Sequence, residues 1–299
     1  MSNHAKRIVV IGEAMLELSR AGENWRLGYG GDTLNTAIHL ARAGNDVDYL
    51  TALGTEPLSA NLRQQWSAEG LGTSLILSHP TRATGLYAIN TDDAGERSFS
   101  YWRDTSAARD MFALPDAEAT LAAAEKADLI AFSLITLAIL PADGRATLLA
   151  LARKVREHGG QVAFDGNYRP RLWSNSLEAR TVRDAAIALA TIGLPTLEDE
   201  TALSGETSAD AVAAHWQNLG CSETVVKLGA KGCRLPDGTI IRPDAVLEPV
   251  DTSGAGDAFN AGYISRRLNG TDLPSAARAG HALAGWTIMR PGAIPARDL

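Results

Sequence analysis

Residues 251–259 combine small residues with carboxylates in an order that suits chemistry on a phosphate group. Gly254, Ala255 and Gly256 have little or no side chain, so an anion can approach their amides closely. A predicted helix follows, and its first amides lie unpaired at the positive end of the dipole. Asp257 falls in the first turn, where we expect it to stay ionised and to accept a proton from an attacking hydroxyl. The alternative is an ordinary glycine loop with a capping aspartate.

Two arginines occupy positions where a ligand is expected. Residues 97–103 alternate in a predicted strand, so Phe99, Tyr101 and Arg103 share one face. Arg169 follows a predicted central strand, and α/β proteins bind ligands at the carboxyl ends of such strands. Two converging guanidinium groups suit a carboxylate better than a neutral sugar. The alternative is that each is a solvated surface arginine.

Several common sites are excluded by the sequence. No Gly-x-x-x-x-Gly-Lys-Ser/Thr pattern of a P-loop is present, and residues 12–15 replace the dinucleotide-binding glycines after the first predicted strand. The six histidines are scattered without an i, i+4 pair, which argues against a metal site built on them. Cys221 and Cys233 have neither metal-ligand spacing nor a disulfide pattern, which is consistent with a reducing cytoplasm.

The composition is that of a packed globular protein. Of the 299 residues, 45% are hydrophobic and 21% are charged, and no internal repeat occurs. The formal net charge of −7, without a cluster of lysine or arginine, disfavours nucleic-acid binding. The apolar run at 8–11 is too short for the core of a signal peptide, and the run at 129–140 is too short to span a membrane. We therefore expect a cytoplasmic protein that binds small molecules and no membrane.

Predicted strands and helices alternate along most of the chain, which indicates an α/β fold with a doubly wound, mostly parallel sheet. Strands are expected at 7–11, 46–53, 129–133, 161–165, 192–195 and 223–228, with a hairpin at 233–235 and 239–242. Helices are expected at 33–43, 58–69, 116–127, 141–158, 176–191, 198–203, 209–219, 254–268 and 275–290. The length and this pattern predict a single domain over residues 1–299.

A second group of strand-like segments interrupts this alternation. They are 15–19, 25–27, 73–77, 84–91 and 97–103, with turns predicted at 21–24 and 92–95. They predict a small antiparallel β lid, formed from about 13–30 and 73–103 and set against the main sheet. Because apolar residues on both faces of such a patch indicate a contact between copies, we expect a homo-oligomer through the lid.

Four motifs, taken in order, resemble those of the ribokinase-like (PfkB) carbohydrate kinases. They are Gly30-Gly31-Asp32 with Asn35, then Asp165, Asn167 and Arg169, then 225–232, and finally 251–259. Their order and spacing span nearly the whole chain. Within that family, the segments 101–108 and 167–173 resemble 2-keto-3-deoxygluconate kinases. The resemblance implies a ribokinase-like fold and an ATP-dependent phosphotransferase with an alcohol acceptor.

The resemblance also implies roles for individual residues. It makes Asp257 the proton acceptor and the amides of Gly254, Ala255 and Gly256 the anion hole. The sugar side would consist of Gly31, Asp32, Asn35, Tyr87, Tyr101, Arg103 and Arg169. The ATP side would consist of Asn167, Lys227, Gly229, Lys231, Gly232, Gly254 and Gly256.

The resemblance predicts that ATP phosphorylates 2-keto-3-deoxygluconate on its 6-hydroxyl, giving 2-keto-3-deoxy-6-phosphogluconate. Alternatives are a kinase of a neutral sugar (fructose, ribose) or a nucleoside, and a sensor without turnover, which an intact Asp257 disfavours. The family organises Mg²⁺ through water with an Asn-x-x-Glu motif, which falls here on 196–199. Asp199 keeps a carboxylate while Thr196 lacks the amide, so Glu198 or Glu200 is an alternative partner.

Overall fold

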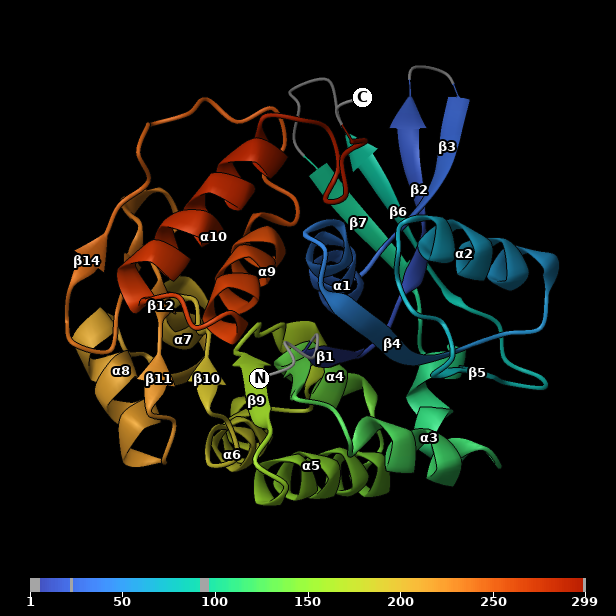
Figure 1. Ribbon diagram of the computed structural model, residues 1–299. Coiled ribbons are helices and arrows are strands. Elements are labelled where there is room, and N and C mark those ends of the chain that lie inside the picture. The colour runs from blue at the N-terminus through green and yellow to red at the C-terminus, as the bar shows by residue number, and fades with distance from the viewer. Residues whose placement is uncertain (1–5, 22–23, 92–96, 298–299) are drawn as a thin grey trace.

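The computed structural model describes residues 6–21, 24–91 and 97–297. Within these residues the main sheet has seven strands, all paired in parallel, in the order β11-β10-β9-β8-β1-β4-β5 (Figure 1). The strands are β1 (Arg7–Ile11), β4 (Asp46–Leu53), β5 (Ile76–Ser78), β8 (Leu129–Ser133), β9 (Gln161–Asp165), β10 (Ile192–Gly193) and β11 (Glu223–Thr224). The predicted doubly wound α/β fold is confirmed, and β1, β4, β8 and β9 have the predicted bounds.

Successive side chains of a central strand pack into opposite layers. In β1, Ile8 and Val10 belong to one core, while Val9 and Ile11 belong to the other. The helices over the first core are α1 (Asp32–Arg42), α2 (Pro57–Ala68), α9 (Ala255–Leu268) and α10 (Leu273–Ile288). The helices over the second are α3 (Ala117–Ala124), α4 (Leu134–Ile139), α5 (Ala142–Glu157), α6 (Ser176–Ile187), α7 (Leu197–Ser204) and α8 (Ala209–Asn218). The main sheet is therefore the middle of three layers (Figure 1).

The sequence pattern does not predict α4 or a 3-10 helix at Ala107–Ala113. The pattern indicates only a strand and its exit at 129–140, because a short, fully buried helix has no polar face to reveal its period. Ser133 nevertheless caps α4, since its hydroxyl accepts from the Thr136 amide at 3.2 Å. In the part of the chain that the structure describes, no helix has the length and apolar character to cross a membrane.

The lid is a four-stranded sheet with the order β3-β2-β6-β7, seen at the upper right of Figure 1. Its strands are β2 (Met15–Ala21), β3 (Asn24–Gly30), β6 (Gly85–Thr91) and β7 (Arg97–Trp102). The two outer pairs are antiparallel, but β2 and β6 are parallel, so the expectation of an antiparallel lid is wrong for the central pair. Residues 22–23 and 92–95 of the predicted turns lie outside the described residues.

The predicted lid strand at 73–77 belongs instead to the main sheet. β5 pairs in parallel with β4, and Ile76 and Leu77 are buried in the two cores. Arg63 of α2 donates to the carbonyls of these two residues at 2.7 and 2.8 Å, which holds the strand at the sheet edge. A short apolar strand has the same pattern in either sheet, so the sequence did not distinguish them. The lid strands therefore span 15–30 and 85–102.

The predicted strand at 223–228 divides between two sheets. β11 ends the main sheet, while β12 (Val226–Lys227) joins an antiparallel sheet with β13 (Cys233–Arg234) and β14 (Ile240–Ile241). The Lys227 amide still donates to the Pro195 carbonyl at 2.8 Å, so β12 runs on past the carboxyl end of β10. This path brings Lys227 to the sheet edge where the predicted site residues gather.

Candidate active site

α9 begins at a tight glycine loop. Gly254 has a φ of 72°, and a side-chain carbon placed on it would lie 2.6 Å from the Ala293 side chain. The Asp251 carboxylate holds this loop by accepting from two backbone amides, both at 2.8 Å. Ala255 is partly exposed and Gly256 is exposed, so the positive end of α9 is accessible to an anion.

Asp257 is buried in the first turn of α9 and faces α1. Its carboxylate accepts from the Asn35 amide at 2.8 Å. Burial raises the pKa of Asp257 to about 8, and the nearby carboxylates of Asp32 and Asp165 contribute to the rise. Burial and the neighbouring carboxylates therefore oppose the ionisation expected of Asp257 from its place in the first turn. A carboxyl group with this pKa is matched to accepting a proton near neutral pH.

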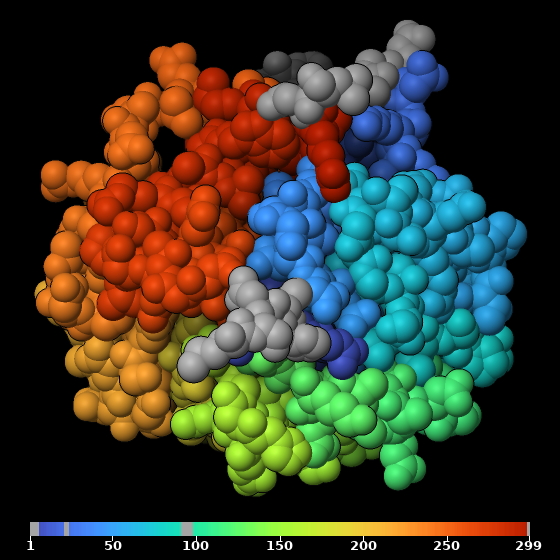
Figure 2. All heavy atoms as spheres, in the orientation of Figure 1, coloured from blue at the N-terminus to red at the C-terminus, as the bar shows by residue number. Residues whose placement is uncertain are grey.

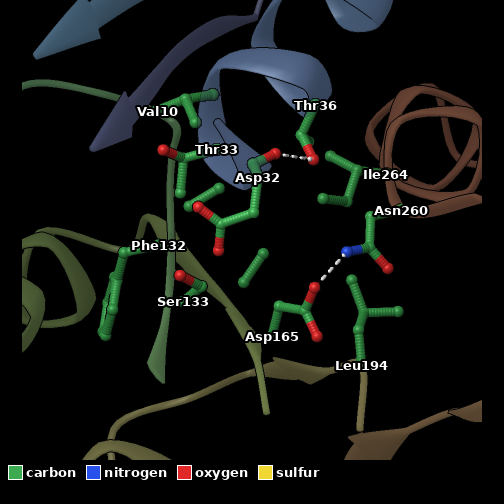
Figure 3. A pocket seen from close by; sticks show the side chains of 12 residues that line it. Val10, Asp32, Thr33, Thr36, Phe132, Ser133, Asp165, Leu194, Asn260 and Ile264 are labelled. Atoms are coloured by element: carbon green, nitrogen blue, oxygen red, sulfur yellow. Dashed lines mark hydrogen bonds between the residues drawn. The ribbon is translucent and has the colours of Figure 1, made fainter. Parts of the chain in front are cut away.

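Lys227, Asp165 and Asn260 form a closed network near Asp257. The Lys227 amine donates to Asp165 Oδ1 and to Asn260 Oδ1, each at 3.1 Å. Asn260 Nδ2 donates to Asp165 Oδ2 at 2.7 Å, the bond drawn in Figure 3. Asp165 ends β9, whereas Asn260 lies one helical turn after Asp257 on α9. A side-chain carbon placed on Gly256 would be 3.7 Å from Lys227 Nζ, so the amine lies beside the start of α9.

A small cavity lies between the side chains of Asp32 and Asp165. It measures about 20 Å³, room for one water molecule, and Ser133 and Asn260 also line it (Figure 3). Asp32 accepts from the Asn167 amide at 3.2 Å. Burial raises the pKa of Asp32, the Asp165 carboxylate adds to the rise, and a hydrogen bond with Ser133 opposes it. The predicted sugar side and ATP side therefore meet through the bond between Asp32 and Asn167.

The lid contributes stacked tyrosines. The Tyr87 hydroxyl donates to the Glu17 carboxylate, and the Tyr87 ring stacks on Tyr101 with 6.1 Å between centroids. Burial raises the pKa of Tyr87, the Glu17 charge adds to the rise, and Asp257 contributes as well, so this tyrosine lies within electrostatic reach of Asp257. Gly31, where the lid returns to α1, has a φ of 146°, and a side chain there would overlap the connection between β1 and β2.

Each arginine predicted at the acid-binding end is paired with a protein carboxylate. Arg103 is buried after β7 and forms an ion pair with Glu13, while its guanidinium carbon lies 5.9 Å from the centroid of the Tyr101 ring. Arg169 has a side chain that is 52% exposed and pairs with Asp199 at 3.2 Å. A ligand at this end would therefore meet the remaining N–H donors rather than two unpaired charges.

The three carboxylates considered for the Mg²⁺ side, Asp199, Glu198 and Glu200, differ in whether their oxygens are free to contact a metal or its waters. Burial raises the pKa of Asp199 to about 6. Glu200 is buried and accepts from Arg183 at 2.5 Å and from the Trp216 indole at 3.0 Å, so both of its oxygens are occupied. Glu198 is exposed. Among the described residues, no group of three or more His, Cys, Asp or Glu side chains is arranged to hold a metal ion directly.

The remaining predicted ATP residues form a tight turn after β12. Gly229 and Gly232 have φ values of 59° and 103°, which favour glycine, and Lys231 is exposed between them. The structure therefore brings Lys227 and Asn167 into contact with the carboxylates, whereas Gly229, Lys231 and Gly232 lie on a separate turn.

Comparison with known proteins identifies the family of this chain. The model of the pfkB family of carbohydrate kinases matches residues 5–298. The chain belongs to this family. It is 42% identical to the 2-dehydro-3-deoxygluconokinase of Dickeya dadantii (strain 3937), with 97% of this chain and 96% of the relative covered.

Solved structures show the same fold as this PfkB kinase. A PfkB protein from Polaromonas sp. JS666 is 29% identical with a TM-score of 0.85, over 95% of this chain and 96% of that one. The aminoimidazole riboside kinase from Salmonella enterica, complexed with aminoimidazole riboside and an ATP analog, is 26% identical with a TM-score of 0.82, over 97% and 95% of the two chains.

Sequence reasoning missed Glu13, Glu17 and Asn260, which contact predicted site residues of this PfkB kinase or the Lys227 network. Asn260 follows Asp257 by three residues on a predicted helix, a spacing that places both on one face and that would have identified it. Glu13 and Glu17 have no such local signal, because their partners Arg103 and Tyr87 are distant in sequence and meet them only through the lid pairing.

We expect the Asp257 carboxyl of this PfkB kinase to titrate near pH 8, and Asn35→Ala to move its titration to higher pH. The Asn35 amide stabilises the ionised form, so its removal favours the protonated one. ¹³C NMR of aspartate-labelled protein measures both values. Asp272 is the internal control, since bonds from Ser275 hold its pKa below the usual range and Asn35 does not touch it. A folded protein in which Asp257 titrates at about 4, the ordinary value, would contradict this assignment.

Proposed function

We propose that this PfkB kinase transfers the γ-phosphoryl group of ATP to the 6-hydroxyl of 2-keto-3-deoxygluconate, giving 2-keto-3-deoxy-6-phosphogluconate. The 42% identity to a 2-dehydro-3-deoxygluconokinase over nearly the full length of both chains supports the substrate. The observation that carries the reaction type is Asp257, a buried carboxyl in the first turn of α9 behind an accessible helix start. The relative bound to an ATP analog supports ATP as the donor.

In the proposed transfer, the sugar hydroxyl oxygen forms a bond to the γ-phosphorus while the bond from that phosphorus to the bridging oxygen of ADP breaks. Asp257 takes the hydroxyl proton, and the amides of Gly254, Ala255 and Gly256 stabilise charge on the phosphoryl oxygens. Because such a transition state is loose, positioning of the hydroxyl contributes more than the strength of the base.

The proposed substrate contacts follow the two ends of the site. Gly31, Asp32 and Asn35 would meet sugar hydroxyls, and Tyr87, Tyr101, Arg103 and Arg169 would surround the carboxylate end. Asn167, Lys227, Gly229, Lys231 and Gly232 would line the nucleotide side. The stacking of Tyr87 on Tyr101 and the position of Arg103 against Tyr101 support one continuous lid surface for the acid.

The site suits a nucleotide that binds together with a metal cation. The Asp165 charge contributes to the raised pKa of both Asp32 and Asp199, and the Lys227 amine donates a hydrogen bond to Asp165. Polyphosphate next to several carboxylates requires a neutralising cation, and Mg²⁺ usually keeps several waters and binds mainly to phosphates. We therefore propose that Asp199 acts on Mg²⁺ through water, since the two oxygens of Glu200 accept from Arg183 and from Trp216. When bound, the ion supplies charge neutralisation of the phosphates.

Asp257→Ala should lower turnover by about 10²–10⁴-fold, because it removes the proton acceptor. Release of ADP in a coupled assay with 2-keto-3-deoxygluconate and Mg-ATP measures this loss, and calorimetry should show that the variant still binds the sugar acid. Near-normal turnover in this variant would refute the proposed mechanism. A wild-type protein that is stabilised by its ligands but releases no ADP would instead indicate a sensor.

Arg169→Ala should raise KM for 2-keto-3-deoxygluconate by about 10-fold or more, because a charged hydrogen bond to the carboxylate is lost. KM for ATP should rise less, since there the change acts only through Asp199, the ion-pair partner of Arg169. Arg180→Ala is the matched control, since this arginine of α6 bonds to a backbone carbonyl at 3.5 Å and lies outside the site. The same assay with fructose, ribose and a nucleoside tests the alternative. A wild-type preference for one of these neutral acceptors would overturn the substrate assignment.

We further propose that two copies associate through the lid. Trp25, Leu27 and Trp102 are 50%, 49% and 60% exposed, and the strand register places them on the face opposite Tyr87. Large apolar side chains gathered on an exposed sheet face are typical of an interface. This interface is compatible with the proposed site because it uses the other face of the lid.

Trp25→Lys should convert a dimer into a monomer, since it introduces a charge into the proposed apolar contact. Light scattering after size-exclusion chromatography measures the mass. Leu177→Lys is the control, because Leu177 is also an exposed apolar residue, at 65%, but lies on α6, away from the lid. A wild-type protein that is monomeric at micromolar concentration would disprove this interface.

A further inference from the structure

Glu13 is a buried carboxylate that takes no direct part in the proposed transfer. It is 2% exposed and lies in the connection between β1 and β2. Its two oxygens accept from the Arg103 guanidinium and from the Ser106 hydroxyl. Burying an ion pair is costly, and apolar residues of similar volume are often at least as stabilising. The ion pair between Glu13 and Arg103 therefore indicates a functional role in addition to any contribution to folding stability.

Glu13 lies where the connections between the main sheet and the lid meet. The described chain passes between them before β2, after β3, before β6 and after β7 (Figure 1). Glu13 lies in the connection before β2. Its backbone carbonyl is close to Gly31, in the connection after β3, and a side chain on Gly31 would overlap this carbonyl. Glu13 Oε1 would be 3.1 Å from a side-chain carbon on Gly85, the first residue of β6, where the third connection ends. Arg103 and Ser106 belong to the fourth.

Arg103 has a buried donor, Nε, that its protein partners leave unused. Its Nη2 donates to Glu13, and Tyr101 faces its guanidinium carbon at 5.9 Å. Its Nε is buried without a hydrogen-bond partner among the described residues. A buried N–H group without an acceptor is costly, so this donor indicates a ligand that supplies the acceptor. The Glu13 charge offsets that of Arg103, which means that the ligand is recognised by a directed N–H group rather than by net charge.

We propose that Glu13 is a positioning residue that holds the Arg103 guanidinium so that its Nε–H group meets the carboxylate of the sugar acid. This inference rests on the proposed function and deepens it. Because Glu13 directly follows β1, the ion pair fixes Arg103 relative to the main sheet, which also carries Asp165. The Nε–H group of Arg103 thus has a fixed position relative to the phosphoryl-transfer end of the site, although Arg103 itself follows a lid strand.

A double-mutant cycle tests this role. Glu13→Gln should raise KM for 2-keto-3-deoxygluconate roughly 10- to 100-fold, the effect of misplacing one charged hydrogen bond, while kcat and KM for ATP stay nearly constant. Arg103→Met should raise the same KM at least as much. The double variant should have the KM of Arg103→Met alone, because Glu13 acts only through that arginine.

Asp48→Asn is the matched control, since it breaks a partly buried pair with Arg7, at 2.7 Å, near the opposite ends of β1 and β4. It should lower the melting temperature without changing KM. If Glu13→Gln does not fold, Ser106→Ala replaces it, because this change removes only the neutral partner of Glu13. Ser106→Ala should raise KM for 2-keto-3-deoxygluconate less than Glu13→Gln does. This rise should also be absent when Ser106→Ala is combined with Arg103→Met.

Additive effects in the cycle, or an equal rise in KM for ATP, would overturn the role of Glu13 while leaving the proposed function intact. A wild-type enzyme that does not phosphorylate 2-keto-3-deoxygluconate would overturn the proposed function itself, and the positioning role with it. The two failures are therefore distinguishable in one set of assays.

Discussion

The proximity of buried carboxylates at the carboxyl edge of the main sheet is the constraint on which the site depends. Asp32, Asp165 and Asp257 come from α1, β9 and α9. Asp165 contributes to the raised pKa of Asp32, and Asp32 and Asp165 both contribute to the raised pKa of Asp257. The Lys227 amine and the Asn35 amide oppose this rise through hydrogen bonds to Asp165 and Asp257. The balance leaves Asp257 with a pKa near neutrality, which suits a proton acceptor better than an ordinary surface carboxyl does.

The fold is arranged to bring these groups together. In parallel strands the carboxyl ends share one edge, so the chain after β8, β9 and β10 arrives at the same place. β12 departs from the main sheet just beyond that edge, which carries Lys227 over Asp165 instead of into the core. α1 and α9 both begin there and contact each other, so Asn35 on one helix reaches Asp257 on the other.

Sequence reasoning succeeded where a local pattern has one structural solution. Continuous apolar runs predicted β1, β4, β8 and β9 with their bounds, and small residues before a helix located the start of α9. It failed where partners are chosen over long distances: 73–77 is apolar in either sheet, and only pairing with β4 decides its place. The raised pKa of Asp257 was not foreseen for the same reason, since its helix position is local in sequence while the opposing charges lie on other elements.

The acid-binding end shows how such long-range partners change a chemical argument. Counting arginines in the sequence predicts a positively charged pocket, but Arg103 and Arg169 are each neutralised by a carboxylate, Glu13 and Asp199. Attraction by net charge would act on any anion, including the phosphates at the other end of the site. Neutralised arginines retain their N–H groups in fixed directions, so they favour a carboxylate only at one position and orientation. The ion pairs therefore weaken the attraction of the site for anions in general. They increase its discrimination between the sugar acid and ATP.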